Sequence, residues 1–417
     1  MHETENEQEK ITKALLIAVD TGEYDAERSM DELEELARTA GAETVGMIIQ
    51  KRPAPDAATC IGSGRLAEAA EEAENLGAEL IIFDCELTAN QIRNIEEITD
   101  IRTIDRTTLI LDIFAGRALT AEGRIQVELA QQKYRLAHLA GKGAALSRLG
   151  GGIGTRGPGE SKLETDRRHI RRRIEALTAQ LRELEGRREL RRARRKKDNV
   201  ITAAIVGYTN AGKSTLLNAL TDAGVLAEDK LFATLDITSR SVVLPDGRQI
   251  LLTDTVGLIR RLPHQLVEAF KSTLEEAANS DIIINVIDAS ADDAEEQAGV
   301  TRTLLSELGC DGIPQINVFN KCDKIPGYEN IPTDSTSVKI SAKQQIGFDD
   351  LLKCIAENLP ANSVRGKFLI PYDKTGLINR ILENGKIFSS EYLPEGTLID
   401  ALVDNRIMAA AREYYTV

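Results

Sequence analysis

The sequence predicts an α/β fold in four parts: a small parallel-sheet domain, a long helical hairpin, a central domain with a mixed, mostly parallel sheet, and a small α+β tail. Three observations lead to this prediction. Short β-branched runs alternate with amphipathic stretches in two separate regions, strand patterns are missing between those regions, and a glycine-rich turn in the second region joins an apolar run to a helix-forming one. We place the boundaries at residues 1–106, 107–199, 200–360 and 361–417.

Composition narrows the class of protein before any motif is considered. A net charge of −14 over 417 residues argues against a protein that coats nucleic acid with its whole surface. The five cysteines lack CxxC spacing, so we expect reduced thiols and neither a zinc site nor disulfides; they are Cys60, Cys85, Cys310, Cys322 and Cys354. The acidic first residues do not fit a signal peptide, and no apolar run reaches the roughly 18 residues of a membrane span. We therefore expect a cytoplasmic protein, with peripheral membrane association left open.

Three apolar runs in the N-terminal region are typical of buried strands: residues 14–19, 44–49 and 80–83. Helical patterns lie near residues 25–39, 65–76 and 88–98. Their alternation predicts a small parallel sheet. The turn Cys60-Ile-Gly-Ser-Gly-Arg65 is a weak candidate for an anion site at a helix N-terminus, and a plain tight loop is the favoured reading.

Residues 123–139 and 161–197 have the composition of long helices. Apolar residues from Ile170 to Leu184 recur in steps of three and four, so the second helix should pack one stripe against the first in an antiparallel hairpin. Residues 150–159, which are mostly glycine, connect the two.

Charge is unevenly divided along the chain. Residues 160–198 hold 15 Lys and Arg against 8 Asp and Glu, a net charge of +7, so the remainder carries −21. A cationic arm on an anionic body is typical of a protein that contacts nucleic acid at one place. We expect RNA contacts from six arginines: Arg148, Arg156, Arg191, Arg192, Arg194 and Arg195. A flexible linker and a solvated helix face are the alternatives to this interpretation.

The central region shows strand and helix patterns again. Residues 241–244 and 249–252 flank an Asp-Gly turn and predict a β-hairpin at one edge of the sheet. Two parallel strands are expected at residues 282–287 and 315–319. The tail has a strand pattern, a helix pattern and an apolar run, at residues 368–370, 377–382 and 398–403. Because the tail is so short, we expect it to pack on a neighbouring domain.

The stretch Gly207-Tyr-Thr-Asn-Ala-Gly-Lys-Ser214 matches the GxxxxGK[ST] phosphate loop in its proper strand-to-helix context. Backbone amides of such a turn point at phosphate oxygens, Lys213 adds a positive charge at the β- and γ-phosphates, and Ser214 is expected to bind Mg²⁺. The residues expected to hold the phosphates are Gly207, Tyr208, Thr209, Asn210, Ala211, Gly212, Lys213, Ser214 and Thr215.

Three further motifs occur in the order that a guanine-nucleotide site requires. Asp254-Thr-Val-Gly257 follows a strand pattern, so Asp254 is expected to hold Mg²⁺ through water and Gly257 to meet the γ-phosphate. Asp323 of Asn320-Lys-Cys-Asp323 can accept both the N1 and N2 protons of guanine, and adenine offers no matching pair. With Ser341-Ala-Lys343, these motifs predict a P-loop GTPase domain that binds GTP and GDP.

The remaining residues assigned to this site include those around Thr234, which is the expected switch threonine. Thr234 is also a candidate Mg²⁺ ligand, beside Ser214 and Asp254. The full set is Phe232, Ala233, Thr234, Leu235, Asp254, Thr255, Val256, Gly257, Asn320, Lys321, Asp323, Ser341, Ala342 and Lys343.

The residue after this DxxG motif bears on the rate of hydrolysis. Many GTPases have a glutamine there that orients the attacking water, and this chain has Leu258, so we expect slow intrinsic hydrolysis and a catalytic group from elsewhere. His264 and Gln265 are close in sequence, but surface positions are the favoured reading for both. Asn210 has two open interpretations, a K⁺ site beside the phosphates and a hydrogen bond that shapes the loop.

The order of these parts resembles the HflX family of ribosome-associated GTPases. The similarity is greatest in residues 150–167, 207–214, 232–236 and 254–264. It implies binding to the large ribosomal subunit, GTP hydrolysis stimulated by ribosomes, and splitting or rescue of stalled ribosomes. A leucine or phenylalanine after DTVG is usual in the family, in agreement with Leu258. Some members are also reported to bind ATP at the N-terminal domain, which we keep as a minor expectation.

A GTP-dependent signalling switch that acts on a protein or membrane partner is the alternative function. Turnover that rises with a protein activator and not with ribosomes would favour it. The C-terminal residues 413–417 carry no lipidation motif, which counts against a membrane partner.

Overall fold

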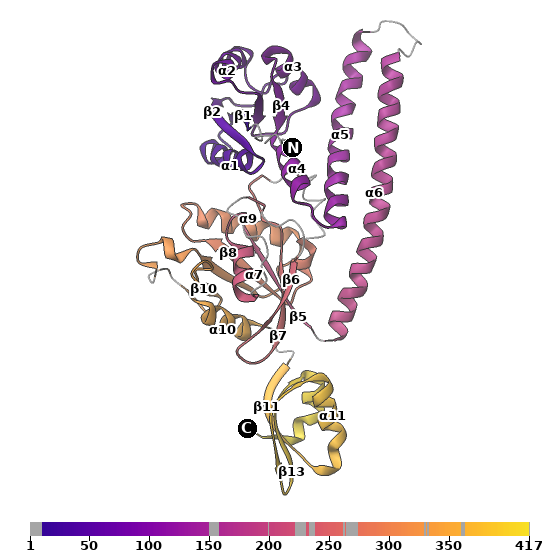
Figure 1. The fold of residues 1–417 in the computed structure, drawn as a ribbon, viewed down its shortest axis with the longest axis vertical. Helices are drawn as coiled ribbons and strands as arrows, with labels where there is room; N and C mark the ends of the chain where they lie inside the picture. The colour runs from indigo at the N-terminus through magenta and orange to yellow at the C-terminus, as the bar shows by residue number, and fades with distance from the viewer. Residues whose placement is uncertain are drawn as a thin grey trace, which may run out of the picture. The chain divides into compact units, whose positions relative to one another are not determined.

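The computed structural model describes residues 11–149, 158–198, 200–221, 231–232, 238–261, 263, 274–328, 331, 333–359 and 363–416. The chain packs as two compact units. The first unit contains residues 1–191 together with two short segments of the central region, 228–236 and 256–273. The second unit contains residues 192–227, 237–255 and 274–417. The α/β fold that the sequence predicts is confirmed in both (Figure 1).

The N-terminal sheet is parallel throughout. Its strands follow the order β2-β1-β3-β4 and comprise β1 (Thr12–Asp20), β2 (Ala42–Lys51), β3 (Leu80–Phe83) and β4 (Arg102–Asp105). The helices are α1 (Ala26–Thr39), α2 (Ser63–Leu76), α3 (Ala89–Thr99) and α4 (Arg106–Arg117). The sequence did not reveal β4, since its four residues contain one aliphatic side chain, Ile104.

Side-chain caps fix the starts of three of these helices. Asp25 accepts a hydrogen bond from the Arg28 amide at the start of α1, and Thr88 forms a capping box at α3. Asp105 caps α4 through the Thr108 amide at 2.8 Å, and it also accepts from the Tyr134 hydroxyl at 2.5 Å. Asp105 therefore connects α4 to the long helix that follows it.

That long helix, α5 (Ala121–Leu149), pairs with α6 (Pro158–Lys197) (Figure 1). Arg173 of α6 donates to both carboxylate oxygens of Glu128, at 2.6 and 2.7 Å. Further along α6, Arg188 pairs with Glu122. A later residue of α6 meets an earlier residue of α5, so the two helices run antiparallel, as predicted.

The central sheet has the order β10-β9-β8-β5-β7-β6, and only the β6–β7 pair is antiparallel. Its strands are β5 (Ile201–Gly207), β6 (Thr238–Val243), β7 (Gln249–Asp254), β8 (Ile282–Asp288), β9 (Gln315–Asn320) and β10 (Ser337–Lys339). Its helices include α7 (Lys213–Thr221), α9 (Ala294–Glu307) and α10 (Phe348–Asn358). The predicted antiparallel edge is confirmed, and β5 lies between β7 and β8 with an almost fully buried aliphatic face.

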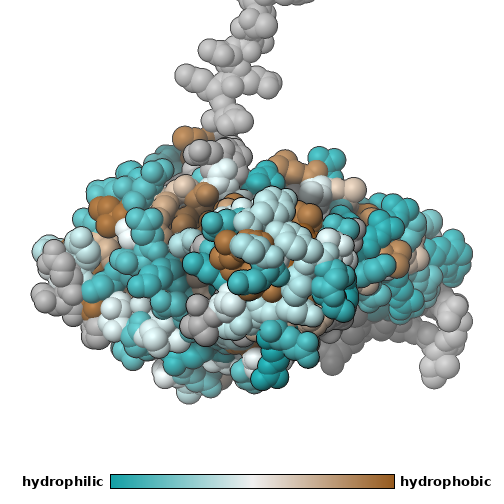
Figure 2. Space-filling model, turned by 90° about the horizontal axis from the view of Figure 1, so that it is seen from below, coloured by the Kyte–Doolittle hydropathy of each residue, from teal (hydrophilic) through white to brown (hydrophobic). Residues whose placement is uncertain are grey.

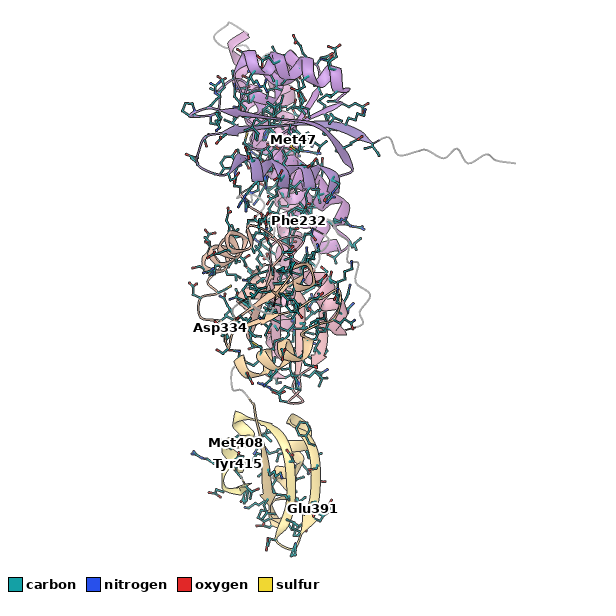
Figure 3. All side chains as sticks on the ribbon, turned by 90° about the vertical axis from the view of Figure 1, so that its left-hand side faces the viewer. Met47, Phe232, Asp334, Glu391, Met408 and Tyr415 are labelled. Atoms are coloured by element: carbon teal, nitrogen blue, oxygen red, sulfur yellow. The ribbon has the colours of Figure 1, made fainter. Side chains whose placement is uncertain are left out.

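The C-terminal residues form an antiparallel sheet, β12-β13-β11-β14, with two helices. The strands are β11 (Ser363–Ile370), β12 (Lys386–Leu393), β13 (Gly396–Asp404) and β14 (Tyr415–Thr416), and the helices are α11 (Thr375–Asn384) and α12 (Asn405–Ala411). Phe368 and Ile399 belong to a core of this domain's own residues. The ring of Tyr415, which Figure 3 labels, packs edge-on against that of Phe368, with the ring centroids 5.7 Å apart. The sequence indicated β11, α11 and β13 but not β12, whose apolar pattern is interrupted by two serines. In the structure, its pairing with β13 shifts register between Ile387 and Ser389.

On the face of the molecule seen in Figure 2, hydrophobic side chains are interspersed with hydrophilic ones. Within the part of the chain that the structure describes, no helix is long and apolar enough to cross a bilayer.

Candidate nucleotide site

The phosphate loop, residues 207–214, joins the end of β5 to the start of α7, and two of its glycines are required by their surroundings. Gly207 has φ +148, and a β-carbon there would lie 2.2 Å from the backbone oxygen of Val286 in β8. Gly212 has φ +95, and a β-carbon there would lie 2.3 Å from the amide nitrogen of Asn320. Both positions exclude side chains, so the loop backbone lies tightly against the carboxyl ends of β8 and β9.

Lys213 is buried at the start of α7. Its ammonium donates to the backbone oxygens of Gly207 at 3.1 Å and Tyr208 at 2.8 Å. Burial lowers the pKa of Lys213 to about 8, and the neighbouring Lys321 adds to this effect while Asp254 opposes it. A bound phosphate would raise the pKa of this ammonium again, because a negative charge favours the protonated form. Lys213 would therefore interact favourably with a negatively charged ligand.

Ser214 and Asp254 form the centre of the predicted metal site. The Ser214 hydroxyl donates to a carboxylate oxygen of Asp254 at 2.8 Å, and Asp254 is fully buried at the end of β7. The next residue, Thr255, donates from its hydroxyl to the Ile205 backbone oxygen at 2.8 Å. The first two residues of the DxxG motif are thus fixed to β5, beside the phosphate loop.

Asn320, the first residue of the NKxD motif, connects two loops. Its side-chain amide donates to the Ala211 backbone oxygen at 2.8 Å, and its side-chain oxygen accepts from the Ala342 amide at 2.9 Å. The residue is 2% exposed, so both hydrogen bonds are shielded from water. Asn320 therefore holds the phosphate loop and the Ser341–Lys343 loop at a fixed spacing, a role that the motif alone did not indicate.

The other two predicted guanine residues of this motif are also held by neighbours. Lys321 has a left-handed backbone, and its ammonium pairs with Asp288 at 2.7 Å. Asp323 accepts a hydrogen bond from the Ser341 hydroxyl at 2.6 Å, which orients its carboxylate. Ser341 is anchored in turn by two backbone hydrogen bonds with Ile346, each of 3.1 Å. The phosphate loop, Asp254 and the guanine motifs thus all belong to the second unit.

The segments that should respond to the γ-phosphate belong to the first unit. Ala233, Thr234 and Leu235 lie outside the described residues, as do His264 and Gln265. Phe232, which Figure 3 labels, is described: it has φ +53 and is 2% exposed. Its ring packs edge-on against that of Phe114 of α4, with the ring centroids 4.6 Å apart. The amide of Leu231 donates to the hydroxyl of Thr39 at 3.3 Å.

The segment after Gly257 is held by the same N-terminal domain. Leu258 and Ile259 are buried, at 3% and 1% exposure. Arg261, with φ +49, donates to the carboxylate of Asp84 at 3.0 Å. Its guanidinium also lies 4.0 Å above the ring of Tyr24, in cation–π geometry. We call these contacts the Arg261 anchor.

A buried arginine supports this anchor. Arg106, the first residue of α4, donates to Asp84 at 2.7 Å and pairs with Glu32, and it also donates to the backbone oxygen of Arg260 at 3.1 Å. The sequence analysis missed Asp84 and Arg106, because their partners lie up to 177 residues away and no local spacing connects them. Their only sequence signal is a charged residue directly after each of two buried strands.

The predicted RNA contacts have different outcomes. Arg191 and Arg194 are exposed on α6, and Arg195 is half-buried. Arg192 pairs with Glu276 at 2.7 Å, so its charge is already partly balanced. The side chain of Arg148 and all of Arg156 lie outside the described residues.

Three family models match consecutive parts of the chain. They describe the N-terminal region of GTP-binding GTPases over residues 27–115, their middle region over residues 117–195, and a 50S ribosome-binding GTPase over residues 202–321.

Two relatives are similar along most of their length. The GTPase HflX of Caldanaerobacter subterraneus is 51% identical over 403 residues, which cover 96% of this chain and 93% of the relative. The GTPase HflX of Escherichia coli is 41% identical over 359 residues, which cover 85% of this chain and 84% of the relative. Among solved structures, a GTP-binding protein from Sulfolobus solfataricus in complex with GDP covers 83% of this chain and 98% of its own, with 24% identity and a TM-score of 0.45.

Proposed function

The chain belongs to the HflX family of GTPases and hydrolyses GTP, and from that premise we propose that its GTP-bound form associates with the large ribosomal subunit and splits or rescues stalled ribosomes. The observation that carries this proposal is the concentration of positive charge in residues 160–198, which include most of α6 and have a net charge of +7 within a chain of net charge −14. The match of residues 202–321 to a 50S ribosome-binding GTPase supports the same partner.

Guanine is the base that this site is built to select. Asp323 would accept the N1 and N2 protons of guanine, and the hydroxyl of Ser341 holds its carboxylate in place at 2.6 Å. Adenine would leave that carboxylate desolvated and unpaired, which costs a site much of its affinity. ATP at the N-terminal domain receives less support, because the Gly62 amide at the start of α2 already donates to the Gln50 side chain at 2.9 Å.

Mg²⁺ fits the residues beside the phosphate loop. Ser214 and Asp254 present hard oxygen ligands 2.8 Å apart, and Thr234 is the third candidate. Among the described residues, no group of three or more His, Cys, Asp and Glu side chains forms a metal site. When bound, Mg²⁺ would neutralise charge on the β- and γ-phosphates.

The response to GTP rests on the backbone around Gly257 and Thr234. A γ-phosphate gives the Gly257 amide and the Thr234 hydroxyl a common acceptor, and hydrolysis removes it. The Arg261 anchor limits the freedom of the first of these segments, since Arg261 follows Gly257 by only four residues. Because Leu258 cannot orient water, we expect slow hydrolysis until the ribosome supplies the missing group.

Charge reversal on α6 tests the ribosomal partner. We expect Arg191→Glu/Arg194→Glu/Arg195→Glu to abolish co-sedimentation with large subunits in the presence of a non-hydrolysable GTP analogue, while GTP affinity stays unchanged. The wild-type interaction should weaken steeply with salt, because contacts with RNA phosphates release counterions. Arg192 is left intact because its pairing with Glu276 is structural.

A matched control makes the same change of charge elsewhere. Arg93→Glu/Arg240→Glu/Arg302→Glu alters three exposed arginines of other helices and strands and should leave sedimentation unchanged. Equal loss of binding in both triple variants would show that the loss results from the change in net charge and not from the position of the arginines on α6. Unchanged sedimentation of the α6 variant would overturn the assignment.

Light scattering of joined ribosomes distinguishes splitting from simple association. A fall in scattering that requires GTP supports splitting, and binding without a fall limits the function to association. GTP turnover that rises with neither subunits nor joined ribosomes would favour the signalling switch instead.

A further inference from the structure

Two cysteines of the N-terminal domain lie side by side although 25 residues separate them in sequence. The sulfur of Cys60 is 3.3 Å from the sulfur of Cys85, and both thiols are free. Cys60 is 1% exposed, within the core of this domain, whereas Cys85 follows the end of β3 and is partly exposed. Solvent therefore reaches the pair from the Cys85 side.

The backbone at Cys60 has an uncommon conformation. Its φ of +67 lies in the left-handed region, which a residue with a β-carbon seldom adopts. Two backbone hydrogen bonds between Cys60 and Asp56, at 2.7 and 3.0 Å, close the short loop that fixes this conformation. The loop thus holds the Cys60 sulfur against Cys85.

The two thiols of this pair differ in acidity. A hydrogen bond with Cys85 lowers the pKa of Cys60, and the nearby Arg52 acts in the same direction. The same hydrogen bond and burial raise the pKa of Cys85, and burial raises the pKa of Cys310, Cys322 and Cys354. Since the thiolate is the reactive form of cysteine, Cys60 is the better nucleophile of the pair.

We propose that Cys60 and Cys85 are a peroxide-sensitive dithiol, and that their oxidation to a disulfide weakens the Arg261 anchor. The Cys60 sulfur attacks one oxygen of hydrogen peroxide, the O–O bond breaks, and the second oxygen leaves as water with the Cys60 thiol proton. The Cys85 thiol then attacks the Cys60 sulfenic acid, the S–O bond breaks, and hydroxide leaves as water with the Cys85 thiol proton. Two thiols thus lose two electrons to one peroxide, giving one disulfide and two waters.

The link to the Arg261 anchor is the position of Cys85 next to Asp84. The carboxylate of Asp84 accepts hydrogen bonds from Arg261 at 3.0 Å, Arg106 at 2.7 Å and the Ser29 hydroxyl at 2.6 Å. A disulfide requires the sulfurs to move from 3.3 Å to about 2.05 Å apart. Movement of Cys85 shifts the adjacent Asp84, and with it the acceptor that holds Arg261.

Mass spectrometry of the full-length protein tests the bond. After hydrogen peroxide and alkylation in denaturant, we expect three alkylated cysteines and a Cys60–Cys85 cross-linked peptide, reversed by dithiothreitol. Cys85→Ser and, separately, Cys60→Ala should prevent the cross-link, whereas Cys354→Ser should retain it. Five free thiols, or a cross-link between other cysteines, would overturn the assignment.

GTP turnover tests the consequence. Oxidised protein should hydrolyse GTP about threefold more slowly than reduced protein, with unchanged GDP affinity, since the phosphate and guanine loops lie in the other unit. Cys85→Ser should be insensitive to peroxide. A disulfide that leaves turnover unchanged would disprove the link to the Arg261 anchor, and inhibition that persists in both cysteine variants would disprove the role of this pair.

Discussion

The phosphate loop and the segment after Gly257 differ in what fixes them. Gly207 and Gly212 pack against β8 and β9, and Asn320 donates to the loop backbone at 2.8 Å, so the contacts come from the central sheet itself. Arg261 instead contacts Asp84 and Tyr24 of the N-terminal domain. The residues predicted to recognise the nucleotide are thus held by the central sheet, whereas the segment after Gly257 is held by residues of the N-terminal domain.

The largest effect is expected from a substitution that changes nucleotide recognition and leaves the segment after Gly257 untouched. Asp323→Asn should weaken GTP roughly a thousandfold, because a carboxylate that accepts both guanine protons is replaced by a side chain that can also donate. The same variant should gain affinity for xanthosine triphosphate, whose C2 oxygen accepts from the new amide. Fluorescent-nucleotide titration measures both affinities. Parallel loss of both would mean that Asp323 supports the loop and does not contact the base.

Alkaline pH should weaken nucleotide binding through Lys213. The lowered pKa of about 8 means that the free protein loses this positive charge above pH 8, while a bound phosphate favours the protonated form. GDP affinity should therefore be constant below that pH and fall by up to about tenfold per pH unit above it. Calorimetry from pH 7 to 9.5 measures the change. Lys213→Arg, which stays charged, is the control and should give a flat profile.

Removing the Arg261 anchor should alter the response without altering recognition. Arg261→Ala frees the segment that carries the Gly257 amide, and ordering it again on GTP costs about 1 kcal/mol or more, so kcat should fall about fivefold. GDP affinity should stay unchanged. Single-turnover hydrolysis and GDP titration measure the two quantities.

A double-mutant cycle sharpens this result. Tyr24→Leu removes the ring under the guanidinium, so its effect should be small once Arg261→Ala is present. Additive effects of the two substitutions would show that Arg261 and Tyr24 act separately. An equal loss of GDP affinity would contradict the division between the two regions.

The smallest effect concerns the cation beside the phosphates. Asn210 has φ +58, a conformation that asparagine tolerates better than most residues, so a loop-shaping role competes with K⁺ binding. If K⁺ binds, turnover should be about threefold higher in KCl than in NaCl, and Asn210→Gly should abolish the difference while keeping the backbone conformation. Equal rates in both salts would leave the loop-shaping role.

The sequence predicted the elements whose signals are local. The parallel strands β1, β2 and β3 stand out as apolar runs, and the phosphate loop is recognisable because its glycines and lysine have a fixed spacing. Short strands such as β4 could not be identified, since four residues carry too little periodicity. The Arg261 anchor could not be predicted from the sequence either, because a contact between residues 84 and 261 depends on the folded chain and not on any local pattern.

Domain boundaries show the same limit. The division at residues 106, 199 and 360 follows changes in pattern along the sequence and stays a prediction. The packing units instead assign residues 228–236 and 256–273 to the N-terminal part, which no linear division can express.

The two hydrogen bonds of Asn320 have a practical consequence for anyone who wishes to redesign the base preference. The side-chain amide of Asn320 forms hydrogen bonds with both Ala211 and Ala342. Replacing Asn320 would therefore weaken the binding of the phosphates together with the binding of the base. Engineering of an orthogonal nucleotide pocket should therefore begin at Asp323 and keep position 320 as it is.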